Sequence, residues 1–292
     1  DQRFLDLCLS NVTLEKLCSG MLWTEGPVYF PCGDYLLFSD IPNNKMYQWI
    51  DGLGRRLYRE HSNNSNGNTR DRTGRLITCE HLTRRVTRTE FDGSISVLVD
   101  QHQGRALNSP NDVVTHSDGS IWFTDPPYGI LSDYEGKKSA QLQAGCFVYR
   151  YQPNTDTLTV VATDFDKPNG LAFSADEKTL YVSDTGLSHD PDGPHHIRKF
   201  TLASSGELSG GEVFAQINSG VPDGFRLDIE GNIWTSCATG VQCFNQQGIL
   251  LGEIKVPEAV ANIEFGGPKG NRLFITASTS LYAIYVATKG LR

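Results

Sequence analysis

The sequence predicts an all-β fold in which six blades of four strands form a ring that a strand from the N-terminus closes. Helical periodicity is scarce, whereas short runs rich in Val, Ile, Leu and aromatic residues recur between turns that contain Gly, Asp and Asn. One strand–turn–strand pattern of 15 or 16 residues occurs six times, with copies that start about 40 to 60 residues apart. Such a period, built only of strand and turn, is typical of a β-propeller.

The six copies follow one another in regular order along the chain. Each begins with an acidic or amide residue, runs through a β-rich segment and a turn, and ends with a second β-rich segment. The copies occupy residues 25–40, 66–80, 111–125, 169–184, 223–237 and 262–277. We expect each copy to supply the two inner strands of one blade.

The outer strands complete the prediction and show how the ring closes. Each of the first five copies is followed by two further β-rich segments, such as KMYQWI and RRLYRE after the first, but the sixth is followed only by LYAIYV. We expect VTLEKLC, residues 12–18, to supply the missing strand, so that residues 1–292 form a single propeller whose remaining edges are short and protected. Long insertions, LSDYEGKKSAQLQAG and GLSHDPDGPH, follow the third and fourth copies and should form loops on the top face.

Composition excludes several classes of partner. The chain has 292 residues, of which 38% are hydrophobic, and a formal net charge of −8. The negative charge argues against nucleic acid or an anionic membrane as a partner, and no run of 18 apolar residues is present. Seven cysteines without a C-x-x-C pair disfavour a disulfide framework or a zinc cage and favour a cytoplasmic location. Because the sequence starts at Asp1 rather than Met, a periplasmic or secreted location stays open, as does the choice between monomer and dimer.

The first residues of the six copies should point at the mouth of the central channel, because the first strand of a blade lines it. All six carry side-chain oxygen and none is Cys or His, a donor set that suits a hard cation such as Ca²⁺, Mg²⁺ or Mn²⁺. They are Glu25, Asn66, Asn111, Asn169, Asp223 and Asn262. The competing interpretation is that these are ordinary turn residues that hydrogen-bond nearby backbone, and it is strongest for Asn66 and Asn262.

A second set of residues ends the second strand of each copy and returns to the same face. Asp40, Glu80, Asp125, Asp184 and Cys237 form this set, for which backbone capping of the neighbouring blade's turn is at least as strong an interpretation as catalysis. The fourth-blade insertion carries His189, His195 and His196, which we interpret mainly as surface residues. The sequence lacks a G-x-S-x-G elbow, a Walker A loop and H-E-x-x-H, which disfavours serine hydrolases and nucleotide enzymes.

Six motifs resemble those of one known family, in order and over nearly the whole chain. They are T-E-G-P-V at 24–28, N-S-P-N-D-V-V at 108–114, W-F-T-D-P-P-Y-G at 122–129, K-P-N-G-L-A-F at 167–173, V-S-D-T at 182–185 and V-P-D-G-F at 221–225. This set is similar to the gluconolactonase / regucalcin / luciferin-regenerating-enzyme-like family, and most of all to its bacterial gluconolactonase branch. The resemblance implies a six-bladed propeller with one divalent metal in the central channel. It also implies hydrolysis of sugar lactones or, in some relatives, of organophosphates.

The resemblance also implies roles for individual residues. Glu25, Asn169 and Asp223 match the family's metal ligands, and Asn111 would contact the metal directly or through water or substrate. Asn66 and Asn262 would line the pocket rather than bind the metal. Ca²⁺ is the metal we expect most, with Mg²⁺, Mn²⁺ and Zn²⁺ as alternatives, because the metal varies within the family.

The sequence therefore predicts a metal-dependent hydrolase that opens sugar lactones of the gluconolactone type to aldonic acids. Asp223 would deprotonate the attacking water, and if it is only a ligand the base should be sought among Asp112, Asp125 and Asp184 or in solvent. The residues expected to hold sugar hydroxyls are Asn108, Arg105, His81, Tyr128 and Asn66. Two alternatives stay open: an organophosphate hydrolase on the same metal site, and a non-catalytic metal-binding propeller.

Overall fold

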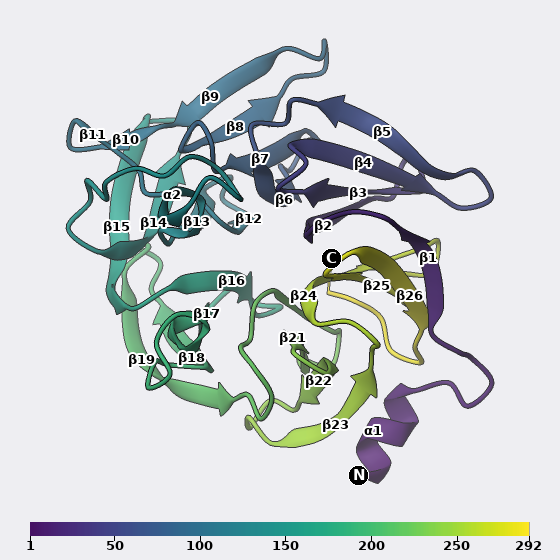
Figure 1. Ribbon diagram of the computed structural model, residues 1–292. Coiled ribbons are helices and arrows are strands. Elements are labelled where there is room, and N and C mark those ends of the chain that lie inside the picture. Colours follow the sequence, from purple (N-terminus) through teal and green to yellow (C-terminus); the bar gives the residue numbers. More distant parts are fainter. Residues whose placement is uncertain (292) are drawn as a thin grey trace.

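Six four-stranded antiparallel sheets surround a central channel in the computed structural model, which describes residues 1–291 (Figure 1). The predicted all-β propeller is confirmed, and in every blade the first strand of the repeat is the innermost one. The first three blades comprise β2 (Thr24–Phe30), β3 (Tyr35–Asp40), β4 (Lys45–Ile50) and β5 (Gly54–Glu60); β6 (Ser65–Arg70), β7 (Leu76–Glu80), β8 (Arg85–Thr89) and β9 (Ile95–Val99); and β12 (Val113–Thr115), β13 (Ile121–Asp125), β14 (Cys146–Gln152) and β15 (Thr157–Phe165).

The remaining blades follow the same order, and the last of them is completed from the N-terminal segment. They comprise β16 (Pro168–Phe173), β17 (Thr179–Asp184), β18 (His196–Leu202) and β19 (Leu208–Gln216); β20 (Phe225–Leu227), β21 (Ile233–Cys237), β22 (Gly240–Phe244) and β23 (Leu250–Lys255); and β24 (Val260–Gly266), β25 (Arg272–Ala277), β26 (Ser280–Tyr285) and β1 (Glu15–Ser19). Short elements lie outside the sheets: α1 (Gln2–Leu7), the pair β10 (Gln101–His102) and β11 (Arg105–Ala106), α2 (Tyr128–Leu131) and a 3₁₀ turn, η1 (Gly186–Ser188).

Ring closure occurs where the sequence predicts it, with a strand that begins three residues later than expected. β1 pairs antiparallel with β26, so that Glu15 lies opposite Ala283 and Ser19 opposite Ser280. Glu258, which precedes β24, reinforces the joint: its carboxylate accepts hydrogen bonds from the Ser280 hydroxyl at 2.6 Å and from Lys16 Nζ at 3.3 Å. The helix α1 was not predicted; it buries Leu7 and places Phe4 against Trp234 of the fifth blade.

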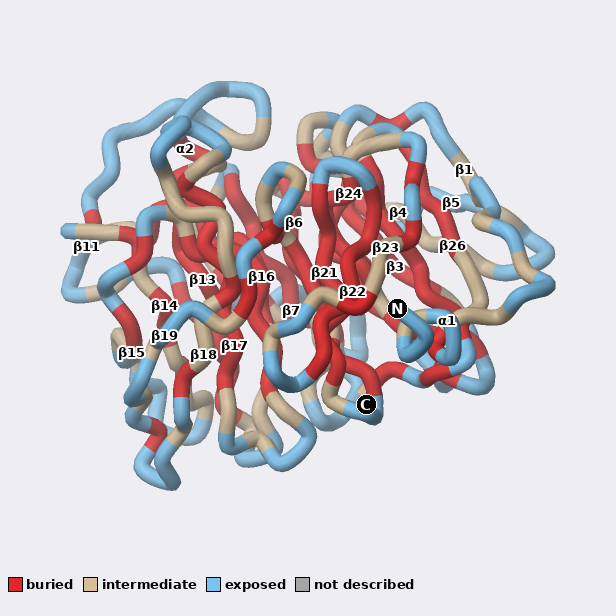
Figure 2. The backbone as a smooth tube through the Cα atoms, turned by 90° about the horizontal axis from the view of Figure 1, so that it is seen from below, coloured by how far each residue is buried: buried red, intermediate tan, exposed pale blue. Residues whose placement is uncertain are grey.

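Hydrophobic side chains fill the spaces between adjacent blades. Buried residues run along the strands and exposed ones gather on the outer strands and connecting loops (Figure 2). One cluster joins the fifth and sixth blades and contains Trp234, Val241, Ile263, Leu273 and Ile275, all with essentially no exposed surface. Burial of this kind, at roughly 25 cal/mol per Å² of apolar surface, is the main force that holds the blades together.

Glycine follows the first residue in four of the six repeats, because neighbouring innermost strands approach very closely there. A Cβ on Gly26 would lie 1.9 Å from the carbonyl oxygen of Asn66, and one on Gly170 would lie 2.4 Å from that of Asp223. Gly67 and Gly224 are equally constrained by the next blade. The Gly170 N–H also donates to the Asp223 carbonyl at 3.1 Å. These close contacts bring the residues that begin the repeats together around the channel.

Candidate functional site

A cavity of about 360 Å³ opens at the end of the channel where the repeats begin. Five of the six predicted ring residues line it, each from a different blade: Glu25, Asn66, Asn111, Asn169 and Asp223. The sixth, Asn262, lies behind Glu25 and donates a hydrogen bond from Nδ2 to Glu25 Oε2 at 3.0 Å. The six residues that begin the repeats therefore lie together at one end of the channel.

Hydrogen bonds from the second strands fix the backbone of the ring. The Asn111 N–H donates to the carbonyl of Thr124 at 2.9 Å, and the Thr124 hydroxyl donates to the carbonyl of Asn169 at 2.7 Å. The Asp223 N–H donates to the Ser236 hydroxyl at 2.8 Å. These bonds satisfy backbone groups of the ring and hold the positions from which its side chains project.

The ring concentrates negative charge in a buried place. Burial, reinforced by the nearby Asp112 carboxylate, raises the pKa of Glu25 to about 8. Burial also raises the pKa of Asp223 well above its usual range, with repulsion from Glu25 and Glu135 as further causes. Carboxyl groups that resist ionisation in this way are stabilised as carboxylates when a cation lies between them.

The donor set fits a hard cation. Two carboxylates and up to three amides supply only oxygen, the ligand that Ca²⁺, Mg²⁺ and Mn²⁺ prefer. Residues 1–291 contain no group of three or more His, Cys, Asp or Glu side chains arranged to hold a metal ion. A cation in this cavity would therefore depend on the amide oxygens of Asn111 and Asn169 as well as on Glu25 and Asp223.

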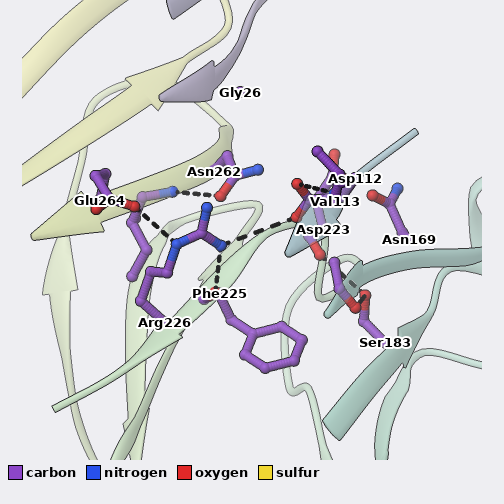
Figure 3. A network of polar contacts seen from close by, with 12 residues as sticks. Gly26, Asp112, Val113, Asn169, Ser183, Asp223, Phe225, Arg226, Asn262 and Glu264 are labelled. Carbon is purple, nitrogen blue, oxygen red and sulfur yellow. Dashed lines mark hydrogen bonds and ion pairs between the residues drawn. The ribbon is translucent and has the colours of Figure 1, made fainter. Parts of the chain in front are cut away.

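An ion network lies directly beneath the ring (Figure 3). Arg226 extends between two carboxylates: its Nε lies 2.8 Å from Glu264 Oε2 and its Nη1 lies 3.9 Å from Asp112 Oδ2. Asp112 is buried and its Oδ1 accepts a hydrogen bond from the N–H of Val113 at 2.9 Å. Arg226 and Glu264 also line a second, more polar cavity of about 410 Å³ at the opposite end of the channel. The network therefore separates the two cavities.

The walls of the first cavity come from the two long insertions and from apolar residues of several blades. Tyr128 of α2 contacts the fourth-blade insertion through its hydroxyl, which lies 2.6 Å from Thr185 Oγ1 and 2.9 Å from Ser188 Oγ. Glu135 and His189 line the same rim, and Trp23, Ile41, Val221 and Val260 are among the apolar lining residues. The cavity thus combines a charged floor, a polar rim and an apolar wall, as sites for small polar molecules commonly do.

The model of the SMP-30/Gluconolactonase/LRE-like region matches residues 23–279. The chain belongs to this family. A gluconolactonase of Zymomonas mobilis is 32% identical over 98% of this chain and 85% of that protein. A pentonolactonase of Haloferax volcanii is 27% identical over 87% of this chain and 81% of that protein. Among solved structures, a gluconolactonase of Xanthomonas campestris superposes with a TM-score of 0.90 and 36% identity, covering 97% of this chain and 92% of that one.

In this family member, only two of the five residues expected to hold sugar hydroxyls line the cavity. Asn66 and Tyr128 line it, whereas His81 is fully buried behind Asn66. Asn108 is buried too, because its Nδ2 donates to the carbonyls of Asp125 at 2.9 Å and Gly145 at 3.0 Å. Arg105 lies on the exposed β10–β11 hairpin, where its Nη1 donates a hydrogen bond of 3.5 Å to the Leu142 carbonyl. The structure does not bring His81, Asn108 or Arg105 to the cavity surface.

Three of the four acidic residues that end the second strands cap backbone, whereas Glu80 accepts hydrogen bonds from the side chains of Asn63, Thr83, Arg85 and Thr87. Asp40 Oδ1 accepts from the N–H of Leu22 at 3.0 Å, and Asp125 Oδ2 accepts from the N–H of Asn108 at 2.8 Å. Asp184 accepts from the N–H groups of Asp166 and Lys167 at 3.0 and 2.9 Å. The capped segment is the one that leads into the same blade rather than the neighbouring blade's turn. Asp125 and Asp184 therefore act as backbone caps, and neither lines the cavity.

Several lining residues were not singled out by the sequence. Glu135, Thr185 and Ser188 lie on or beside the long insertions, and His189, interpreted mainly as a surface residue, also lines the cavity. Burial raises the pKa of Glu135 to about 7. The available signal was the length of the insertions, which identified loops on this face without indicating which of their side chains turn inward.

Proposed function

We propose that the protein is a metal-dependent hydrolase that opens sugar lactones to aldonic acids. The observation that carries this proposal is the ring of two carboxylates and three amides at the floor of one cavity. The relatives support the substrate class, since those that match most of the chain include a gluconolactonase and a pentonolactonase. The polar rim suits a small ligand with several hydroxyl groups.

Glu25, Asn111, Asn169 and Asp223 would hold the metal, with Ca²⁺ as the first candidate and Mg²⁺, Mn²⁺ and Zn²⁺ as alternatives. When bound, a divalent cation supplies Lewis-acid polarisation of a carbonyl oxygen and acidifies water. Asn262 keeps Oε2 of Glu25 in place through its 3.0 Å hydrogen bond. Arg226 provides a fixed positive charge beneath the ring that favours the ionised form of Asp112.

Asp223 is the proposed general base. It lines the cavity, its backbone is fixed by Ser236, and its carboxylate lies close enough to Glu25 for their charges to repel. A carboxylate that is kept ionised by a neighbouring cation can take a proton from water as the water attacks the lactone carbon. The proton then goes to the ring oxygen that leaves as an alcohol, so that the products are the open aldonic acid and regenerated enzyme.

The test is a pH-indicator assay of five- and six-membered aldonolactones, run beside phosphotriesters on chelator-treated protein resupplied with single cations. We expect lactone hydrolysis that chelator abolishes and one or more cations restore. Hydrolysis of phosphotriesters alone would favour the organophosphate alternative. Metal binding by calorimetry without hydrolysis of either class would favour the non-catalytic propeller, and full lactone hydrolysis after chelation would contradict metal dependence.

A further inference from the structure

In the side-chain amide of Asn66, the nitrogen has a hydrogen-bond partner and the oxygen has none among the described residues. Asn66 lines the cavity from β6 and is 3% exposed. Its Nδ2 lies 3.2 Å from Nε2 of His81. Its Oδ1 is buried and has no hydrogen-bond partner among residues 1–291. A buried acceptor left without a donor costs free energy, so this oxygen calls for an explanation.

The surroundings of His81 determine which way the amide faces. The ring is fully buried, and its Nδ1 lies 3.2 Å from the carbonyl oxygen of Glu135, which can only accept. Nδ1 must therefore carry the ring proton, and burial lowers the pKa of His81 to about 4, so the ring is neutral at physiological pH. Nε2 is then an acceptor, and only the NH₂ group of Asn66 can satisfy it. The Asn66 oxygen is consequently turned away from His81.

The backbone of α2 packs closely against His81 and limits the movement of its ring. A Cβ added to Gly129 of α2 would lie 2.5 Å from His81 Cβ and 2.6 Å from Cγ, so the helix packs directly on the imidazole. The main chain of Asn66 is held as well, because its carbonyl accepts from the Ser39 hydroxyl at 2.8 Å and from Asn68 Nδ2 at 2.9 Å. The direction of the Asn66 amide is therefore fixed before any ligand arrives.

We propose that Asn66 Oδ1 accepts a hydrogen bond from one hydroxyl group of the sugar lactone, and that His81 is the positioning residue that directs this oxygen to the ligand. The inference rests on the proposed function. It connects the third-blade insertion to the cavity floor through one line of hydrogen bonds: the Glu135 carbonyl, His81, the Asn66 amide and the substrate hydroxyl. His81 thus acts on the substrate without touching it.

This arrangement predicts an effect on substrate binding rather than on the chemical step. The contact with a distant hydroxyl is present in both the ground state and the transition state, so its loss raises KM more than it lowers kcat. We expect Asn66→Ala to raise KM for gluconolactone about tenfold, the effect of about 1.4 kcal/mol of binding free energy. His81→Phe keeps a ring of similar shape but removes both hydrogen bonds, which frees the amide to turn. It should raise KM by a similar factor.

The decisive experiment is a double-mutant cycle of Asn66→Ala and His81→Phe, with KM and kcat measured for gluconolactone and for analogues that each lack one hydroxyl. If His81 acts through Asn66, the double variant has nearly the KM of Asn66→Ala. One analogue, the one that lacks the recognised hydroxyl, should bind equally well to wild type and Asn66→Ala. His81→Gln, which keeps an acceptor for the Asn66 NH₂ group, should recover part of the affinity that His81→Phe loses. If His81→Phe fails to fold, His81→Leu, which also lacks the acceptor, takes its place in the cycle.

Three results would overturn the proposal. If the two substitutions have additive effects on KM, His81 has a merely structural role. If Asn66→Ala raises KM equally for every analogue, Asn66 does not recognise one particular hydroxyl group. A fall in calorimetric metal affinity in Asn66→Ala, measured without substrate, would make Asn66 a metal ligand instead.

Two further measurements do not depend on hydrolysis. Long-range ¹H–¹⁵N correlation spectra of the histidine rings should show the proton of His81 on Nδ1, and a proton on Nε2 would contradict the assignment. If wild-type protein hydrolyses no lactone, the proposed function fails, and calorimetric titration with gluconate then decides the acceptor role alone. Equal gluconate affinity of wild type and Asn66→Ala, or no binding by either, would refute it.

Discussion

Asn262 Nδ2 donates a 3.0 Å hydrogen bond to Oε2 of Glu25, although 237 residues separate the two in the chain. The bond joins the innermost strand of the last blade to that of the first. It places a neutral donor against a buried carboxylate, which partly offsets the burial that raises the pKa of Glu25. Closure of the ring and orientation of a proposed metal ligand are thus achieved by the same contact.

Glu25→Gln should weaken metal binding while leaving the fold intact. The substitution keeps the shape of the side chain and removes one of the two carboxylates of the ring. We expect at least about a tenfold loss of cation affinity by calorimetry, about 1.4 kcal/mol. Glu264→Gln is the matched control, because Glu264 is a partly buried carboxylate on the neighbouring strand that does not line this cavity. Full metal occupancy and normal activity of Glu25→Gln would contradict the assignment.

Asp223→Asn should reduce kcat about 10²-fold or more, the usual contribution of a positioned general base. The amide keeps an oxygen donor of nearly the same shape but cannot take a proton. Metal affinity should fall as well, so kcat is to be measured at saturating metal. Asp166→Asn, which changes a more exposed carboxylate outside the cavity, should have near wild-type kcat. If saturated Asp223→Asn keeps near wild-type kcat, Asp223 is only a ligand, and the base is Glu135 or solvent, because Asp112, Asp125 and Asp184 do not line the cavity.

Removal of residues 1–19 should leave the ring open. The deletion exposes the edge of β26, whose partner is β1, and we expect an insoluble or molten product. Removal of residues 1–9 is the control, since it takes away α1 but keeps β1. Size-exclusion chromatography and urea unfolding distinguish the two outcomes. A 1–19 deletion that is soluble, cooperative in unfolding and active would show that the closure strand is dispensable.

Stability at acidic pH should report on Glu258. Burial opposes ionisation of this carboxyl, but hydrogen bonds from Ser280, Tyr282 and Thr279 outweigh it and lower the pKa to about 2. A pKa below the unfolded value means that the carboxylate stabilises the fold above about pH 4.5 and that this contribution is lost as the pH falls towards 2. Glu258→Gln should therefore lower Tm at pH 7, and the difference from wild type should shrink at pH 2–3. A Tm difference independent of pH would exclude this linkage.

Gly26→Ala should destabilise the protein far more than Gly52→Ala. Both glycines have positive φ, 52° and 75°, so an alanine costs about 1 kcal/mol of backbone strain at either position. At Gly52 the added methyl group meets nothing within 4 Å, whereas at Gly26 it lies 1.9 Å from the Asn66 carbonyl oxygen. We expect a loss of about 3 kcal/mol or more for Gly26→Ala in urea unfolding. Similar losses for both variants would mean that the innermost strands can separate without much cost.

Repetition explains why the sequence predicts the propeller and its ring so well. Each blade repeats the same local pattern, so aligning the copies superimposes residues that are related by the symmetry of the ring, and Glu25, Asn169 and Asp223 emerge at equivalent positions. The rim breaks that symmetry. Tyr128 contacts Thr185 across 57 residues, and the buried place of His81 depends on how the third-blade insertion packs on it. These are long-range contacts between unique loops, and no periodicity in the sequence encodes them.

Asn108 and Arg105 show the same limit in another form. Both lie near the correct face, but the side-chain amide of Asn108 is consumed by two backbone carbonyls, and Arg105 belongs to a short hairpin on the outside of the ring. Residue type and approximate location were predictable. The direction of each side chain was not, because it depends on which backbone groups the neighbouring loops leave without partners.

The pairing of β1 with β26 also constrains the order in which the chain can fold. β1 is the first strand of the ring to be synthesised, whereas its partner β26 is the last. Five blades can therefore assemble during synthesis while β1 stays unpaired. The pairing of β1 with β26 is then a non-local step of high contact order, and such steps are intrinsically slow. A nascent chain that stalls before residue 280 would retain an unpaired strand at one end and an incomplete blade at the other, and each could recruit a second molecule.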